Sequence, residues 1–174
     1  MTDYTIRPAT PTDLPGARSV MLDTLYRDLG YGYNPPWHED VIDPGTVYLD
    51  NPRHALFVAV LGDEVVATTG VRAVAPLSPP HPDWLVARYP RDQTAQLFRV
   101  YVRENHRRHG LARRLVGEAV RFVAGVGGYE VLYLHTDARV AGAEAFWNSV
   151  AKQVHDARDG DLERFQTVHY EIPF

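Results

Sequence analysis

A strand, a short loop and a helix follow one another directly in the second half of this 174-residue chain, and no other feature constrains its fold as tightly. Residues 95–102 form a mostly apolar run that is typical of a buried strand. Residues 103–109 are polar, and residues 110–126 place apolar and basic side chains on opposite faces of a predicted helix, which two glycines end. A buried strand that leads into an amphipathic helix is typical of a mixed α/β fold.

The junction between this loop and helix has the chemistry of an anion-binding site. The first turn of a helix leaves main-chain N–H groups unpaired, and the helix dipole favours negative charge there, so a pyrophosphate would fit. Gly110 and Ala112 leave the approach open. The positive charges around them come from Arg107, Arg108, Arg113 and Arg114. Taken by itself, the short motif Arg-x-x-Gly-x-Ala also fits a basic helix start that faces solvent.

Apolar patterns define the other elements. In chain order we expect a strand at 5–7, helices at 14–29 and 37–49, strands at 54–61 and 64–74, a strand at 131–134, a helix at 141–150, and a hairpin of residues 153–157 and 164–172. Residues 75–92 contain five prolines, too many for a regular element, and so long a loop is either a functional flap or a surface excursion. Because no repeat or linker interrupts this order, we predict a single domain over residues 1–174.

Composition excludes several classes of protein. The chain has no cysteine, which removes disulfide frameworks, thiolate metal sites and cysteine nucleophiles. Its net charge of −4 does not favour nucleic acid or an anionic membrane, and no run approaches the about 18 apolar residues of a membrane span. No metal-ligand spacing is present. We expect a cytoplasmic protein with no metal, no nucleic-acid partner and no membrane association, and we consider a homodimer as its assembly.

Three segments resemble one known family. Residues 97–102, Leu-Phe-Arg-Val-Tyr-Val, with the Arg-x-x-Gly-x-Ala loop, closely resemble the central strand, loop and helix of GNAT N-acetyltransferases. Residues 6–14 are similar to the opening of that family, and residues 145–150 to its late helix. The resemblance implies an α/β (mixed α+β) GNAT acyltransferase fold, in which a central mixed, mostly antiparallel sheet is splayed at its central strands and flanked by about four helices.

The same resemblance implies a function. A GNAT N-acetyltransferase moves an acetyl group from acetyl-CoA, its co-substrate, to a primary amine by direct attack in a ternary complex. We expect that amine to belong to a small molecule. The alternative is a GNAT fold that binds acyl-CoA with little or no transfer and serves as a sensor or interaction module. A protein-modifying acetyltransferase is a third option, which the long proline-rich loop disfavours.

The family pattern assigns the cofactor residues by position. Val100, Tyr101 and Val102 are expected to hold the pantetheine arm through their main chain, with the Val100 N–H facing the thioester carbonyl and stabilising the charge that develops on its oxygen. The pyrophosphate is expected to lie on Arg107, Arg108, His109, Gly110, Leu111, Ala112 and Arg113.

Two departures from the family pattern leave the proton path open. Gln96 stands where the family often has a glutamate base, and an amide cannot act as a base near neutral pH. Trp147 stands where the family often has a tyrosine acid. His135 is the candidate replacement base, although a structural histidine is an equal reading. The cluster of residues 38–40 is a second candidate, more typical of a solvated helix face, and a water chain is a third.

The acceptor side is less specified. Aromatic residues could form a wall over a small molecule or could pack the N-terminal helices; they are Tyr31, Tyr33, Trp37, Trp84 and Tyr89. Arg99 lies within the central strand, where its side chain could pair with a carboxylate of the acceptor. That contact would favour an amino acid or a similar acidic amine.

Overall fold

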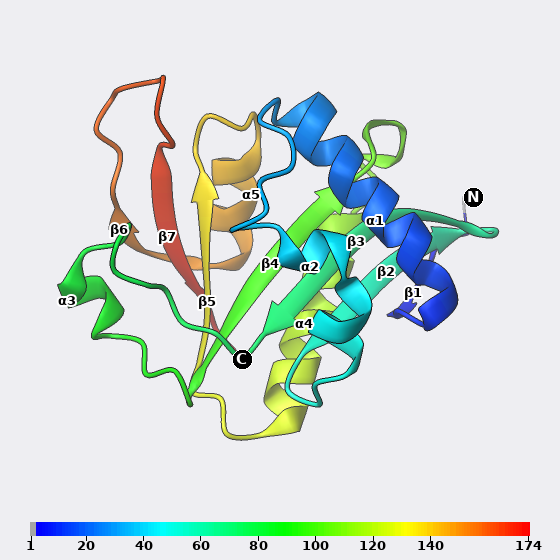
Figure 1. Ribbon diagram of the computed structural model, residues 1–174, viewed down its shortest axis with the longest axis horizontal. Helices are drawn as coiled ribbons and strands as arrows, with labels where there is room; N and C mark the ends of the chain where they lie inside the picture. The colour runs from blue at the N-terminus through cyan, green and yellow to red at the C-terminus, as the bar shows by residue number, and fades with distance from the viewer. Residues whose placement is uncertain (1–2) are drawn as a thin grey trace. The chain divides into compact units, whose positions relative to one another are not determined.

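The computed structural model describes residues 3–174 and contains a seven-stranded mixed sheet and several helices (Figure 1). The strands are β1 (Thr5–Pro8), β2 (Ala55–Leu61), β3 (Glu64–Arg72), β4 (Thr94–Val102), β5 (Val131–Asp137), β6 (Lys152–Asp156) and β7 (Thr167–Ile172). Their order in the sheet is β1-β2-β3-β4-β5-β7-β6. The β4–β5 pair is parallel, whereas β1–β2, β2–β3, β5–β7 and β6–β7 are antiparallel. The predicted fold class is confirmed.

The helices are α1 (Leu14–Asp23), α2 (Glu39–Ile42), α3 (Asp83–Val86), α4 (Leu111–Val126) and α5 (Ala143–Val150). Short 3₁₀ turns lie at Pro11–Asp13 and Glu104–His106, and π-helical turns at Thr24–Asp28 and Gly45–Leu49. Within residues 3–174, no helix has the length and apolar character needed to cross a membrane.

Three expectations about helices were wrong. The helix expected at 14–29 changes to a π-helical turn after Asp23, where the Thr24 hydroxyl donates to the Val20 carbonyl at 2.9 Å and competes with the regular ladder. The helix expected at 37–49 is interrupted at Pro44, which has no N–H to donate. The proline-rich stretch 75–92 contains the short helix α3, because Pro82 stands just before the helix, where its missing N–H costs nothing.

The described chain groups into two compact units. Unit 1 comprises Met1–Arg72 and Leu97–Phe122, and unit 2 comprises Ala73–Gln96 and Val123–Phe174. Strand β4 begins in unit 2 and ends in unit 1. The single domain over residues 1–174 stays a prediction.

The core of unit 1 forms between α1 and the strands β2 and β3. Apolar residues at helical spacing on α1, namely Ala17, Val20 and Met21, have no exposed surface. Gly16 makes this contact close, because a Cβ there would lie 2.9 Å from a methyl of Val65. Helix α4 buries its predicted apolar face through Leu111, Leu115 and Ala119 and leaves its arginines exposed.

The core of unit 2 gathers around Tyr133 on β5. Leu85 of α3 and Tyr89 are buried, and the Tyr89 and Tyr133 rings lie 4.8 Å apart between centroids. The Tyr89 hydroxyl and the Arg88 guanidinium each donate to Glu171 of β7 at 2.9 Å. The proline-rich segment is therefore anchored to the sheet of its own unit.

Candidate active site

The hydrogen-bonded ladder between β4 and β5 covers only the first residues of β4. The parallel ladder joins Thr94, Ala95 and Gln96 to β5 residues 131–133, and β4 continues to Val102. The main-chain groups of residues 97–102 on this side of β4 thus lie outside the β4–β5 ladder. The ladder thus ends within the central strand, where the splay was predicted, and polar main-chain groups outside a ladder are ones that an extended ligand could pair with.

A backbone irregularity marks the same strand. Arg99 has a φ of 54°, a left-handed conformation that is unusual for a residue other than glycine. The hydroxyl of Thr68 on β3 donates to the Arg99 carbonyl at 2.8 Å. Val100, whose N–H is the expected donor to the thioester, follows immediately, so the conformation of Arg99 sets the direction of that N–H.

The loop between β4 and α4 has the form of an anion cradle. Arg108 and Gly110 both have positive φ, at 65° and 71°, and α4 begins at Leu111. Across residues 3–174, no main-chain carbonyl accepts from the N–H groups of Arg108, His109 or Gly110. Successive N–H groups in such a turn, next to a helix N-terminus, make a concavity that suits phosphate. The left-handed conformation explains the glycine at 110.

The Arg107 side chain is committed elsewhere in unit 1. Its Nε donates to the Val102 carbonyl at 3.0 Å, and its guanidinium pairs with Asp28 of the π-helical turn after α1. Arg107 therefore supports the loop through its side chain. Arg108 is exposed beside the open N–H groups.

Arg99 carries a buried ion pair. Its Nε and Nη2 donate to the two carboxylate oxygens of Asp40 at 2.9 and 2.7 Å, and Nη2 also donates to the Trp37 carbonyl at 2.9 Å. The Asp40 side chain has no exposed surface, and Tyr48 donates to it at 2.6 Å. Burial would raise the pKa of Asp40, but the hydrogen bonds and charge of Arg99 and the Tyr48 hydroxyl outweigh it, and the pKa is lowered.

This pair changes two expectations. A guanidinium held in bidentate fashion by an internal carboxylate already has its counterion, so Arg99 does not offer an uncompensated charge to a substrate carboxylate. The solvated helix face expected at residues 38–40 was wrong for two of its members, because His38 is 3% exposed and Asp40 is fully buried. Burial, and then the charge of Arg99, lower the pKa of His38, whose Nδ1 accepts from the Asn34 N–H at 2.7 Å.

The aromatic residues of the expected acceptor wall have different surroundings. Tyr31 and Tyr33 lie against the buried ring of His38, at 6.2 and 6.0 Å between centroids. The Trp37 side chain is 65% exposed. In unit 2, Trp84 is exposed beside His155, whereas Tyr89 is a core residue, so for Tyr89 the packing alternative holds.

The candidate base His135 lies in unit 2 within a hydrogen-bonded chain. The Tyr133 hydroxyl is 2.7 Å from Nδ1 of His169 and 3.3 Å from Nδ1 of His135. His169 and Tyr133 are fully buried, whereas His135 is exposed. Burial, and then the nearby Tyr89, raise the pKa of Tyr133, which stays a neutral phenol. The imidazoles of His135 and His169 thus both contact the Tyr133 hydroxyl.

The residues that replace the family's acid and base are both buried in unit 2. Gln96 is 5% exposed and pairs in register with Tyr133. Trp147 of α5 is 7% exposed, and its ring meets that of Phe146 at 4.8 Å.

Comparison with known proteins identifies the family. The sequence model of the Acetyltransferase (GNAT) family matches residues 19–150. The chain belongs to the GNAT acetyltransferase family. No match was found among curated proteins. The protein is therefore an acyltransferase, and its family uses acetyl-CoA as co-substrate.

Solved structures share the fold of this GNAT acetyltransferase at low sequence identity. A GNAT acetyltransferase of Staphylococcus aureus Mu50 has a TM-score of 0.73 at 13% identity, with 98% of each chain covered. An acetyltransferase of Streptococcus agalactiae 2603 also gives 0.73, at 14% identity with both chains fully covered. The ribosomal-protein-S18-alanine N-acetyltransferase of Escherichia coli gives 0.66 at 17% identity, with 98% of this chain and 94% of that chain covered.

The residues of unit 1 fit acetyl-CoA. The open N–H groups at 108–110 suit its phosphates, and the main chain of residues 100–102 lies outside the β4–β5 ladder. No group of three or more histidine, aspartate or glutamate side chains that could hold a metal occurs in the described part of this acetyltransferase.

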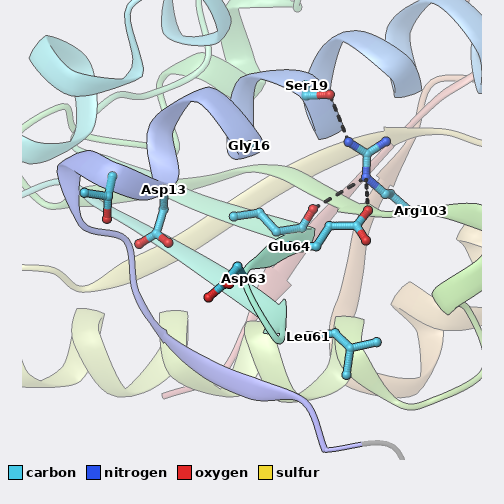
Figure 2. A pocket seen from close by; sticks show the side chains of 9 residues that line it. Asp13, Gly16, Ser19, Leu61, Asp63, Glu64 and Arg103 are labelled. Atoms are coloured by element: carbon cyan, nitrogen blue, oxygen red, sulfur yellow. Dashed lines mark hydrogen bonds and ion pairs between the residues drawn. The ribbon is translucent and has the colours of Figure 1, made fainter.

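Unit 1 also has a surface hollow (Figure 2). It is lined by α1 and by the turn between β2 and β3, and it contains Asp13, Gly16, Asp63 and Arg103. Arg103 bonds the Ser19 hydroxyl at 2.9 Å and pairs with Asp23, and the Asp13 carboxylate is bound by Arg7. The charges in this hollow are therefore partly neutralised within the protein, and none of the expected site residues lies there.

Sequence reasoning missed Tyr48, Tyr133 and His169. Tyr133 and His135 stand two apart on one strand, and that spacing could have placed them on one face. His169 meets them through the β5–β7 register, and Tyr48 meets Asp40 through a π-helical turn. Neither contact can be predicted from a local sequence pattern.

Proposed function

We propose that this acetyltransferase moves the acetyl group of acetyl-CoA to the primary amine of a small molecule, by direct attack in a ternary complex. One observation supports this most strongly: the part of β4 outside the β4–β5 ladder runs directly into a loop whose N–H groups are open and whose next element is the N-terminus of α4. Together they provide an edge for an extended arm and a cradle for its phosphates.

The proposed cofactor contacts follow from these two parts of unit 1. The main chain of Val100, Tyr101 and Val102 holds the pantetheine arm. The N–H groups of residues 108–113 hold the pyrophosphate, with the Arg108 side chain beside it, and Arg107 supports the loop from behind through Asp28. Gly110 is needed for its positive φ and not only for space, because a Cβ there would meet no atom within 4 Å.

The chemical step makes one bond and breaks another. The amine nitrogen attacks the thioester carbon, the C–N bond forms, and the C–S bond breaks to release CoA. The carbonyl oxygen gains negative charge in the transition state, and the Val100 N–H stabilises it there. Holding the amine against the thioester carbon contributes a further part of the rate enhancement.

We propose His135 as the group that removes the amine proton. Because an O–H···N bond is shorter than an N–H···O bond, we assign the 2.7 Å contact to a bond that Tyr133 donates to His169, and the 3.3 Å contact to one that Tyr133 accepts from Nδ1–H of His135. That arrangement places the lone pair of His135 on Nε2, where a base needs it. Gln96 and Trp147 do not titrate near neutral pH, so CoA would leave with a proton taken from water.

A small molecule is the proposed acceptor, and a protein amine is the class it competes with. Structural neighbours include ribosomal-protein-alanine N-acetyltransferases of Brucella melitensis and Escherichia coli, at 18% and 17% identity. Identity this low indicates a shared fold and leaves the acceptor open. The proline-rich segment of unit 2, which Arg88 and Tyr89 bond to Glu171, supports the small-molecule proposal, because so long a loop argues against an open peptide groove.

We place this reaction in the cytoplasm, without nucleic acid as a partner. The chain has no cysteine with which to form the disulfides common in secreted domains, and its net charge is −4.

Thermal stabilisation by acetyl-CoA tests the cofactor site. At about 100 times its dissociation constant the ligand should add about 2.7 kcal/mol to the stability of the parent. The Arg108→Glu, Gly110→Asp variant should lose this gain. An Arg121→Glu, Gly125→Asp variant makes the same changes further along α4 and should keep it. No gain in the parent at millimolar acetyl-CoA would remove the cofactor assignment.

Release of CoA thiol with a panel of amines tests transfer. Turnover with small amines and none with N-terminal peptides supports the proposal, and the reverse favours a protein acceptor. Binding of acetyl-CoA without turnover on either class would favour a sensor, the reading that Gln96 and Trp147 keep open.

A further inference from the structure

We propose that Asp40 and Tyr48 are positioning residues that clamp Arg99 in its left-handed conformation and so aim the Val100 N–H at the thioester carbonyl. The inference rests on the proposed function for the role of Val100. Nothing in the family pattern assigns a part to Asp40, Tyr48 or their bond to the strand.

The strain to be held is local and measurable. At a φ of 54°, the Cβ of Arg99 approaches the backbone carbonyl, which is unfavourable for a residue other than glycine. A left-handed residue inside a strand also interrupts the pleat, so the residues after it point in new directions. Left to its own preference, residue 99 would return to the extended region and turn the Val100 N–H with it.

The clamp closes on Arg99 from three sides. Asp40 of α2 takes Nε and Nη2 in a bidentate pair, and the Trp37 carbonyl takes Nη2 as well. On the main chain, Thr68 of β3 holds the Arg99 carbonyl. The planar guanidinium fixes direction as well as distance, which a lysine ammonium could not do.

Tyr48 holds the carboxylate in turn. Its hydroxyl donates to Asp40 Oδ2, the same oxygen that receives Arg99 Nε. Its ring is fully buried against Gly70 of β3, where a Cβ would lie 2.6 Å from the ring. Asp40 is thus fixed by two donors, Arg99 and Tyr48, whose side chains are largely buried within unit 1.

A buried ion pair is a poor device for stability alone. Removing two charges from water costs several kcal/mol per ion, and apolar residues of similar volume are often at least as stable. Burial opposes the charge on Arg99, yet the bonds to Asp40 raise its pKa, so the charge is kept. What the pair provides beyond stability is one defined geometry at residue 99.

Two double variants separate the clamp from simple packing. Asp40→Asn, Arg99→Gly and Asp40→Asn, Arg99→Ala both remove the ion pair and the long side chain. Glycine adopts positive φ without a Cβ penalty, and alanine does not. We expect the glycine variant to keep a kcat about tenfold above that of the alanine variant, with similar dissociation constants for acetyl-CoA. Tyr48→Phe should lower kcat less than either.

Crystal structures of the two double variants read the conformation directly. Residue 99 should stay at positive φ with glycine and move to negative φ with alanine. Asp23→Asn, which loosens the ion pair of Arg103 after β4, is the matched control and should leave φ at 99 and kcat unchanged.

Either of two results would overturn the clamp: an alanine variant that keeps residue 99 at positive φ, or equal kcat values for the two variants in the presence of normal acetyl-CoA binding. If the parent transfers no acetyl group to any amine, the proposed function fails, and the φ measured at residue 99 still decides whether Asp40 holds the strand.

Discussion

His169 on β7 has no exposed surface and lies among other imidazoles, which makes the fold sensitive to acid. Burial, and then repulsion by His135, His81 and His155, lower its pKa to about 3. In the unfolded chain a histidine titrates near 6.5. Between these values only the unfolded state binds the proton, so the free energy of unfolding should decrease as pH falls, by up to about 1.4 kcal/mol per pH unit.

Urea unfolding from about pH 4.5 to about pH 7 measures this slope. The variant His169→Gln keeps a polar group near Tyr133 but does not titrate, and its slope should be shallower by about one proton. Asp13, whose pKa is lowered by its bond to Arg7, contributes equally to both proteins and cancels in the comparison. Parallel slopes for parent and variant would contradict the assignment.

Replacing His135 should affect catalysis without affecting the cofactor. A general base contributes typically 10²–10⁴-fold, so His135→Gln should lower kcat by about 100-fold and leave the acetyl-CoA dissociation constant unchanged. A variant with the kcat of the parent would show that His135 is not the base and would favour a water chain.

Tyr133→Phe tests how the base is oriented. Without the phenol, Nδ1 of His135 loses the acceptor proposed at 3.3 Å, and we expect kcat to fall about tenfold. Tyr89→Phe removes a neighbouring buried hydroxyl, bonded to Glu171 and not to a histidine, and serves as the control. In the parent protein, ¹⁵N chemical shifts of the neutral His135 ring should show its hydrogen on Nδ1. A hydrogen on Nε2 would contradict the proposed arrangement.

At the scale of elements, sequence periodicity located most of the fold and little of the site. The 3.6-residue pattern of α4 and the apolar runs of β2, β3 and β4 were sufficient to predict these elements, because α4 buries one face and the strands are buried or half-buried along nearly all of their length. The interruptions were missed: a threonine hydroxyl widens α1 into a π-helical turn, and Pro44 splits the second helix. Single hydrogen bonds decide such boundaries, and they do not alter the apolar pattern.

The site divides in the same way. The loop at 107–112 could be predicted because the residues that form a loop before a helix N-terminus are consecutive in the sequence. The partners of Arg99 and His135 could not, because Asp40 and His169 are distant in sequence and reach them only through tertiary register. For that reason Arg99 was expected to meet a substrate carboxylate, whereas the protein supplies the carboxylate itself.

Two glycines on different elements should respond oppositely to alanine. A Cβ at Gly70 of β3 would lie 2.6 Å from the Tyr48 ring, which is fully buried and cannot move away without leaving Asp40. Gly70→Ala should therefore lower stability by about 1–3 kcal/mol through overpacking. Gly117 lies on α4, where a Cβ would meet only the tip of Arg121 at 4.0 Å, and Gly117→Ala should raise stability by about 0.5–1 kcal/mol.

Thermal unfolding monitored by circular dichroism compares the two variants with the parent. The Gly70 variant should also show a lower kcat if Tyr48 is displaced from Asp40, which links packing on β3 to the proposed clamp. A Gly70→Ala protein as stable as the parent would show that the Tyr48 ring can shift at little cost.

At the scale of the whole molecule, one boundary between the two units falls inside a continuous strand, β4. The chain crosses between the units three times, and the crossing at residues 96 and 97 lies inside β4. Neither unit is built from one continuous segment, and domain boundaries normally fall in exposed linkers and not within a strand. These features support the predicted single domain, in which both units unfold in one cooperative transition.

Amide hydrogen exchange with acetyl-CoA tests that cooperativity. The proposed ligand contacts belong to unit 1, yet in a single transition the ligand stabilises every amide that exchanges through global unfolding. At about 100 times its dissociation constant, acetyl-CoA should slow the most protected amides of β2 and β3 in unit 1 and those of β5 and β7 in unit 2 by the same factor, about 100-fold. Slowing confined to unit 1 would show that the units open separately, and the strand they share would then break at Gln96, where its ladder to β5 already ends.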